Sequence, residues 1–254
     1  HGTLMDSVGY GDTVIQMTGY IQVTSLSGSL NLSTKSLHWK GINSNNCYIR
    51  SNGVACVILG NSCSISDVNI FATSTSAGGG LGGIGISVDN ANKVFINRVN
   101  SSGVYVGLLC QNGSGIKVDK STIIGSCYGT VLYQTPSYEL DSCIIKSVAG
   151  NQYATSDCIS LLVSSDSLAN LSVNNGIARN CKISATRTTG ISNSKMYAVN
   201  YGGIGTFEDC DISVSSTYAS GTICGVKITQ DSDRCAVNLR GGSVFVTGAA
   251  TGYD

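Results

Sequence analysis

The chain has 254 residues, of which 12% are charged, and its 15 basic and 15 acidic residues leave no net charge. Balanced charge gives no electrostatic reason to expect nucleic acid or an anionic membrane as a partner. An apolar content of 42% at zero net charge also excludes the low-hydrophobicity, high-charge regime of disordered chains. With 32 Gly and many Ser, Thr and Asn residues in place of charge, the composition favours short strands and polar turns over helices.

We expect neither a targeting signal nor a membrane span in this sequence. No basic segment followed by an apolar one opens the sequence at His1, so we expect a signal peptide to be absent or already removed. The longest nearly uncharged apolar stretch, residues 53–60, is far shorter than the roughly 20 residues that cross a bilayer. We therefore expect no membrane insertion.

Residues 85–150 contain three consecutive segments of equal length. The segments 85–106, 107–128 and 129–150 align with one another without a gap, and each begins with Gly. A fixed period of this size is typical of a stacked repeat array. Two apolar positions recur in all three segments, with Ile96, Val118 and Leu140 at one and Val94, Ile116 and Tyr138 at the other.

A shorter pattern, apolar-x-x-small-x-apolar, recurs along most of the chain. Its starts follow the same period in the regular block and are more widely spaced elsewhere, so we expect the excess residues in loops that leave one turn. Because the pattern extends over most of the sequence, we expect a single domain over residues 1–254. The occurrences are residues 37–42, 65–70, 96–101, 118–123, 140–145, 178–183, 207–212 and 239–244.

The third residue of the pattern predicts a bend between two strands. It is Asp67, Asn180, Asp209 or Gly241 in four occurrences, and these residue types tolerate a left-handed backbone conformation. A change from a period of two to a period of three at the same place also indicates a bend.

The fourth residue of the pattern is small in all occurrences but the first, where it is Lys40. In three occurrences it is Cys143, Cys181 or Cys210, which we expect to stack as a ladder of thiols. The 11 Cys of the chain are scattered without CxxC or His spacing. We therefore expect most of them to be buried free thiols, and we expect no zinc site.

Short strands joined by bends at a fixed period predict an all-β chain wound as a single-stranded parallel β-helix, with about nine or ten coils and loop insertions. Coils about 4.8 Å apart would form a rod of about 45 Å. The pattern, together with the opening Gly11, Asp12 and Thr13 before an apolar residue, resembles the pectate-lyase-like right-handed β-helix superfamily. The resemblance covers nearly the whole chain and implies a right-handed solenoid. It does not select a function, since the superfamily contains lyases, hydrolases, epimerases and phage tailspikes.

The polygalacturonases of this superfamily resemble one another in Asn-Thr-Asp, Asp-Asp, Gly-His-Gly and Arg-Ile-Lys strings, and none of these occurs here. Inverting hydrolysis needs two carboxylates on either side of the scissile bond. The contiguous acidic cluster is Glu208, Asp209 and Asp211. We interpret it as a solvated turn in which Asp209 lies at the bend and its two neighbours point outward.

Pectate and alginate lyases of this superfamily use acids that bind calcium and an Arg or Lys that abstracts a proton. In the regular coils the register places Arg98 over Lys120 and Asp119 over Asp141. These four are the candidate catalytic residues under a lyase hypothesis, and Ca²⁺ is expected only under that hypothesis; otherwise we expect no cofactor and no metal. The alternative is that stacked charges form surface ion pairs, as Lys117 over Glu139 would.

Tyrosine is the commonest aromatic residue, with 12 against 4 Phe and 1 Trp. Five lie in or just after the regular coils: Tyr105, Tyr128, Tyr133, Tyr138 and Tyr153. Their rings and hydroxyls suit contact with sugar rings, and we name the first four as candidate glycan-binding residues. A subunit contact and plain packing are the alternative interpretations.

Only residues 245–254 follow the last occurrence of the pattern, so we expect the strand edges at that end to be covered by a missing continuation of the chain, a neighbouring subunit or another protein of an assembly. Low charge and missing catalytic strings favour a non-catalytic structural or receptor- or glycan-binding protein. Its setting would be a virion, as a phage tailspike, fibre or decoration protein, or a cell-surface appendage. We expect the chain to form a homo-oligomer, in the first place a trimer, or to contact other subunits of a larger assembly. We expect this assembly on a virion, outside the cell or at the cell surface. The alternative function is an extracellular polysaccharide lyase or glycoside hydrolase.

Overall fold

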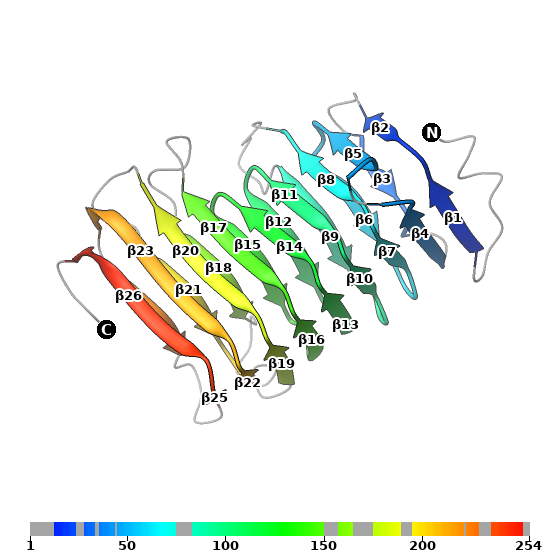
Figure 1. The fold of residues 1–254 in the computed structure, drawn as a ribbon. Coiled ribbons are helices and arrows are strands. Elements are labelled where there is room, and N and C mark those ends of the chain that lie inside the picture. The colour runs from blue at the N-terminus through cyan, green and yellow to red at the C-terminus, as the bar shows by residue number, and fades with distance from the viewer. Residues whose placement is uncertain are drawn as a thin grey trace.

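In the computed structural model the chain winds into a right-handed parallel β-helix, with coils stacked in order from the blue N-terminal end to the red C-terminal end (Figure 1). The structure describes residues 13–23, 28–33, 36–43, 45–74, 83–149, 157–164, 175–188, 195–220, 222–228 and 235–250. Every regular element among these residues is a β-strand, and the strands pair in parallel. No α-helix long and apolar enough to cross a membrane occurs in this part of the chain.

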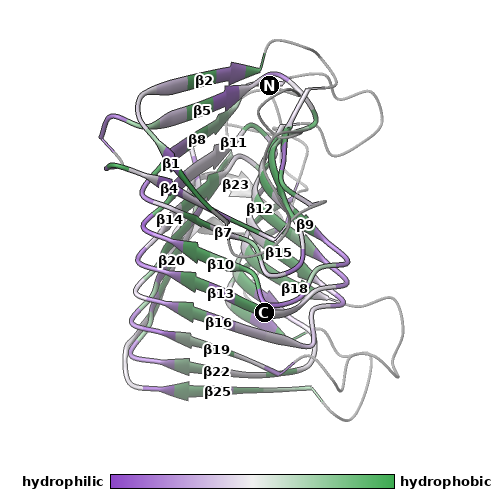
Figure 2. Ribbon diagram, turned by 90° about the vertical axis from the view of Figure 1, so that its right-hand side faces the viewer, coloured by the Kyte–Doolittle hydropathy of each residue, from purple (hydrophilic) through white to green (hydrophobic). Residues whose placement is uncertain are grey.

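Three sheets form the three sides of the solenoid, and each complete coil contributes one strand to each sheet. Sheet A consists of β1 (Thr13–Met17), β4 (Leu37–Gly41), β7 (Ser64–Ser66), β10 (Phe95–Asn97), β13 (Ser114–Asp119), β16 (Ser137–Asp141), β19 (Asn175–Arg179), β22 (Ile204–Glu208) and β25 (Ala236–Arg240). Figure 2 shows the strands of sheet A from β7 to β25 one above another.

Sheet B consists of β2 (Tyr20–Val23), β5 (Tyr48–Ser51), β8 (Asn69–Ala72), β11 (Asn100–Gly103), β14 (Thr122–Gly125), β17 (Ile144–Ala149), β20 (Lys182–Arg187), β23 (Asp211–Ser220) and β26 (Ser243–Ala250). Sheet C consists of β3 (Leu30–Asn31), β6 (Ala55–Leu59), β9 (Ile84–Asp89), β12 (Val106–Gln111), β15 (Tyr128–Tyr133), β18 (Cys158–Ser164), β21 (Met196–Tyr201) and β24 (Ile223–Ile228). The described strands therefore define nine coils, which agrees with the nine or ten coils expected from the sequence.

The predicted register of the regular coils is confirmed. Ile96 pairs with Val118, which pairs in turn with Leu140, and all three side chains are buried. Ile116 pairs with Tyr138 in the same strands. Since successive side chains of a strand point to opposite faces, these apolar rows fill the interior, and the residues between them lie on the outer surface.

The predicted bend is also present, at the corner between sheets A and B. Asp67, Asn180, Asp209 and Gly241 have φ values of 57°, 52°, 51° and 70°. The same position is left-handed in the coils where the residue type did not predict it, at Arg98, Lys120 and Ser142, with φ values of 50°, 46° and 53°. The bend therefore depends on the geometry of the corner, and the residue type adjusts its cost.

The first occurrence of the pattern, residues 37–42, was placed wrongly by two residues. The structure pairs Trp39 with Ile65, and Ile42 is 54% exposed. The carbonyl oxygen of Cys47 accepts a hydrogen bond from the backbone N–H of Asn69, and that of Val68 accepts one from Asn100 in the next coil. Cys47 therefore occupies the corner position in this coil. The corner in this coil is longer than in the later ones, which explains why Lys40 was the exception to the small-residue rule.

The cysteines form no disulfides, and ten of the eleven are buried, as predicted. Cys143, Cys181 and Cys210 are stacked at the corner between sheets A and B, where they are at most 3% exposed. The Sγ of Cys181 lies 3.1 Å from the carbonyl oxygen of Arg179 and 3.5 Å from that of Leu140 in the preceding coil. The hydrogen bond with Cys143, together with burial, raises the pKa of Cys181 to about 12.

Candidate functional site

The outer face of sheet A carries two rows of aligned side chains, which together we name the charged face. The row next to the bend contains Asn97, Asp119, Asp141, Arg179, Glu208 and Arg240, each paired with the next along the sheet. The parallel row contains Lys117, Glu139, Ile177, Thr206 and Asn238. Because the in-register pairing of a parallel sheet stacks equivalent positions about 4.8 Å apart, like and unlike charges are direct neighbours here.

Opposite charges on this face are joined in a chain of ion pairs. Glu139 accepts from Lys117 Nζ at 3.2 Å and from Arg179 Nη1 at 2.9 Å. The same guanidinium donates through Nε to Glu208 at 3.0 Å, and Arg240 contacts Glu208 at 3.4 Å. The predicted pair of Lys117 with Glu139 is thus confirmed. Each pair is solvent-accessible, so each contributes less than about 1 kcal/mol to stability.

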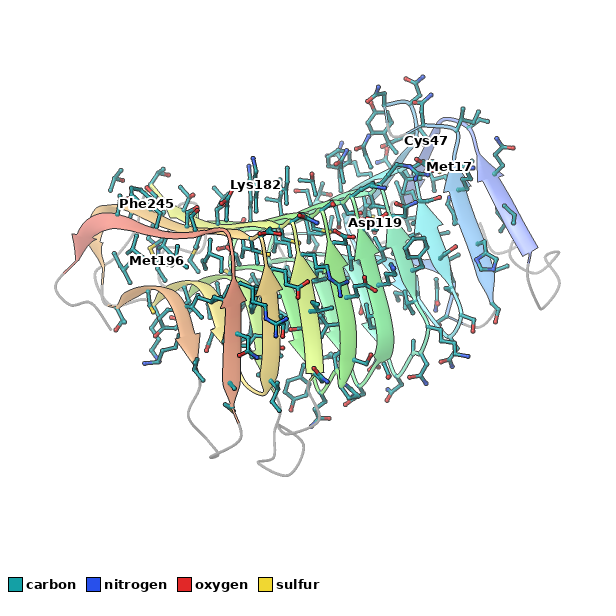
Figure 3. All side chains as sticks on the ribbon, turned by 60° about the horizontal axis from the view of Figure 1, so that its bottom comes forward. Met17, Cys47, Asp119, Lys182, Met196 and Phe245 are labelled. Carbon is teal, nitrogen blue, oxygen red and sulfur yellow. The ribbon has the colours of Figure 1, made fainter. Side chains whose placement is uncertain are left out.

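Asp119 and Asp141, two of the candidate catalytic residues, lie in register on neighbouring strands. Asp119 is near the corner between sheets A and B (Figure 3), and its carboxylate lies 3.7 Å from the Nζ of Lys120. Asp141 accepts a hydrogen bond from Ser142 Oγ at 3.0 Å and one from Asn180 Nδ2 at 3.4 Å. The structure therefore brings three of the four predicted residues together.

The fourth candidate, Arg98, points to the preceding coil. Its Nε and Nη2 donate to the two carboxylate oxygens of Asp67 at 2.6 Å and 2.8 Å. This hydrogen bond raises the pKa of Arg98 and lowers the pKa of Asp67. The raised pKa keeps the guanidinium protonated and leaves less of the neutral form that could accept a proton, which disfavours Arg98 as the group that abstracts a proton.

The acidic pair supplies few of the ligands that a calcium site needs. Calcium takes six to eight oxygen ligands, whereas Asp119 and Asp141 supply one carboxylate each and already contact Lys120, Ser142 and Asn180. Among the described residues no group of three or more His, Cys, Asp or Glu side chains is arranged to hold a metal ion.

Three of the candidate tyrosines lie on the outer side of sheet C, away from the main core. Tyr105 and Tyr128 contact edge to face, with ring centroids 5.6 Å apart. They and Tyr133 are half-buried and pack beside Leu109 and Val131, which belong to an apolar cluster separate from the main core. Burial raises the pKa of the Tyr128 hydroxyl. Tyr153 lies outside the described residues.

Tyr138 is largely buried, and only a small part of it lines the cavity described below. Its position is one of the inward rows of sheet A, so the ring enters the core, where 5% of the residue remains exposed. Its hydroxyl donates to the hydroxyl of Tyr201 at 2.6 Å. The alignment of Tyr138 with Ile116 already indicated an inward position, and a role of this residue in glycan binding stays a prediction.

Sequence reasoning missed a cavity on the charged face. It has a volume of about 520 Å³ and lies over β13, β16, β19 and β22. Its wall contains the polar or exposed side chains of Lys117, Ser137, Glu139, Asn175, Ile177 and Thr206, and the inward-row residues Ile116, Tyr138 and Gly176 also line it, together with Gly115. The coil-to-coil register could have indicated the stack of Lys117 over Glu139. The long insertion before Asn175 hid its alignment with Ser137, which the structure shows as a direct pair.

The chain is thus a right-handed parallel β-helix protein with a polar cavity on a charged outer sheet. No family model matches the chain, and no curated protein matches it in sequence.

Among solved structures, a pectin methylesterase in complex with a hexasaccharide is 11% identical with a TM-score of 0.49, over 93% of this chain and 87% of that one. Jun a 1, the major allergen from cedar pollen, is 10% identical with a TM-score of 0.49, over 92% of this chain and 81% of that one. The Dettilon tailspike protein is 10% identical with a TM-score of 0.37, over 93% of this chain and 61% of the tailspike chain. Similarity at this level assigns neither an activity nor a ligand to this chain.

Proposed function

We propose that this protein is a non-catalytic β-helix that binds a glycan, as part of a virion, in a tailspike, fibre or decoration protein, or of a cell-surface appendage. The observation that carries the non-catalytic part is the bidentate pair of Arg98 with Asp67. It directs the guanidinium of Arg98 to Asp67 in the preceding coil and keeps it protonated, so Arg98 is a poor candidate base beside Asp119 and Asp141. The polar cavity of about 520 Å³ has a volume within the range of about 300–1,000 Å³ that is typical of small-ligand sites, which supports the glycan-binding part.

The proposal also includes assembly: the chain forms a homo-oligomer, in the first place a trimer, or contacts other subunits of a larger assembly. It is supported by apolar side chains exposed on the outermost described coil, where Leu239, Val244 and Phe245 are 48%, 49% and 62% exposed. Phe245 projects from the outer face of β26 (Figure 3). Exposed apolar groups that gather in one place mark protein contact sites. Light scattering on the full chain tests this part, and a monomer at micromolar concentration would contradict it.

The second candidate function is an extracellular polysaccharide lyase or glycoside hydrolase. It is favoured by the stacked carboxylates of Asp119 and Asp141 with Lys120 beside them. In that case Lys120, rather than Arg98, would be the base, since its side chain is 63% exposed and is not held in a bidentate ion pair.

One experiment separates the two functions. The full chain is incubated with a panel of neutral and acidic polysaccharides, and retention on each is measured together with release of reducing or unsaturated ends. The proposed function predicts retention without release. Release that disappears in Lys120→Ala or Asp119→Asn, but persists in Arg98→Ala, would establish the enzyme alternative. Absence of both retention and release on every glycan would contradict both functions.

A further inference from the structure

The cavity on sheet A extends across four neighbouring coils. Its outer wall follows one row of the charged face, from Lys117 through Glu139 and Ile177 to Thr206. Three coil spacings give this row a length of about 14 Å, which suits one or two sugar rings aligned with the solenoid axis. Ser137 and Asn175 form the second wall, on strands β16 and β19.

The charges at the cavity compensate one another. Both carboxylate oxygens of Glu139 are in ion pairs, one with Lys117 at 3.2 Å and the other with Arg179 at 2.9 Å. An anionic ligand would approach this carboxylate, and a cationic ligand would compete with two cations already in place. A neutral ligand with several hydroxyl groups does neither, because it can add hydrogen bonds without breaking an ion pair.

The uncharged groups of the cavity offer both donors and acceptors. The hydroxyls of Ser137 and Thr206 can each donate and accept a hydrogen bond. The side-chain amide of Asn175 presents two donor hydrogens and one acceptor oxygen. Ser137 and Asn175 are exposed, and Thr206 is half-buried. Ile177 is half-buried between them and presents an apolar surface. Mixed polar groups around one apolar patch match a sugar ring, which has hydroxyl groups at its edge and C–H groups on its faces.

We infer that this cavity, and not the tyrosine cluster outside sheet C, binds the glycan, and that its ligand is an uncharged hexose unit. The inference rests on the proposed function and names its site and substrate class. Tyr105, Tyr128 and Tyr133 lie on another side of the solenoid, so the two sites can be separated by substitution.

The test uses isothermal titration of the full chain with gluco-, galacto- and manno-configured hexasaccharides and with hexagalacturonate. We expect at least one neutral hexasaccharide to bind. The double variant Asn175→Ala, Thr206→Val should lower the affinity of the chain for that hexasaccharide at least tenfold. Asn238→Ala is the matched control. It removes an exposed amide from the same row as Thr206, one coil beyond the cavity, and leaves the affinity unchanged. Circular dichroism and the thermal midpoint verify that each variant is folded.

A second variant tests the charge argument. Glu139→Gln keeps the size of the side chain and leaves Lys117 and Arg179 without their shared carboxylate. Binding of hexagalacturonate is then expected to appear or to rise at least tenfold, and to fall again with added salt. A wild-type preference for hexagalacturonate over every neutral hexasaccharide would overturn the substrate class.

The failures of the two proposals are distinguishable. Binding that survives in the cavity variant and is lost in Tyr133→Ala overturns the site and leaves the glycan-binding function intact. If no hexasaccharide binds and no polysaccharide retains the chain, both the site and the proposed function are wrong.

Discussion

The hydroxyl of Tyr138 donates a hydrogen bond to the hydroxyl of Tyr201 at 2.6 Å, across the interior of the solenoid, and Tyr201 donates in turn to the carbonyl oxygen of Ile204 at 3.1 Å. The two rings come from sheets A and C and meet in the core. Burial raises the pKa of Tyr201 to about 12 and that of Tyr138 further above its ordinary value, so both hydroxyls stay protonated and paired.

The direction of these bonds predicts an asymmetry between two similar substitutions. Tyr138→Phe removes one donor and leaves Tyr201 bonded to Ile204, so the free energy of unfolding should fall by about 1 kcal/mol. Tyr201→Phe leaves the Tyr138 hydroxyl buried without a partner, which costs about 1–3 kcal/mol. Urea unfolding of the two variants measures the difference. Equal losses, or a larger loss in Tyr138→Phe, would contradict the assigned donor order.

The same rings explain two glycines. Gly176 and Gly205 follow Tyr138 along its inward row, and an added Cβ at either would overlap a tyrosine ring, that of Tyr138 at Gly176 and that of Tyr201 at Gly205. Gly176→Ala should therefore destabilise the protein by about 1–3 kcal/mol through overpacking. Combining it with Tyr138→Ala should cost less than the sum of the two single changes, because the shortened side chain frees the space. The exposed substitution Ser137→Ala, in the same coil, is the control and should change stability little.

Register could be predicted from the sequence where the coils carry no insertion. Ile96, Val118 and Leu140 recur at a constant interval in the sequence, and they are paired in the structure. The first coil was misplaced because its corner reaches Cys47, and a longer corner shifts the repeat without changing its apolar character.

Side-chain direction was harder to predict than register. Arg98 and Lys120 occupy equivalent bend positions, yet Arg98 reaches back to Asp67 and Lys120 contacts Asp119. A long side chain at a corner selects among partners on either side, and sequence spacing does not rank them. Arg187 is a further case, since it is fully buried in an inward row between Ala149 and Ser216, where an apolar residue would be expected.

The pair of Asp67 with Arg98 predicts a dependence of stability on pH. Because the folded-state pKa of Asp67 is lowered by Arg98, the pair stabilises the fold at pH values above the unfolded pKa of about 3.9. That contribution is lost as the pH falls through the lowered folded-state pKa. Arg98 is 49% exposed, so the contribution is less than about 1 kcal/mol.

The comparison of wild type with Asp67→Asn measures this contribution. The substitution removes the charge and keeps a residue type that tolerates the left-handed bend. Its destabilisation in urea should be measurable at pH 7 and should shrink as the pH falls below about 4, where Asp67 is protonated first in the unfolded chain and, below its lowered pKa, in the folded chain as well. A destabilisation that is the same at pH 7 and pH 3 would assign the effect of the substitution to the bend rather than to the ion pair.

The buried thiols predict a sharp difference in reactivity between the folded and the unfolded chain. Ten of the eleven cysteines are buried, so a reagent in solution has no access to them in the native state, and burial also raises the pKa of Cys56 to about 12. A water-soluble disulfide reagent should label one thiol, Cys235, in the folded protein and all eleven in denaturant. Cys235→Ser identifies the reactive position, since native labelling should then disappear. Rapid native labelling of Cys143, Cys181 or Cys210 would mean that the corner between sheets A and B opens, and that the thiol ladder is less tightly packed than its exposure of at most 3% indicates.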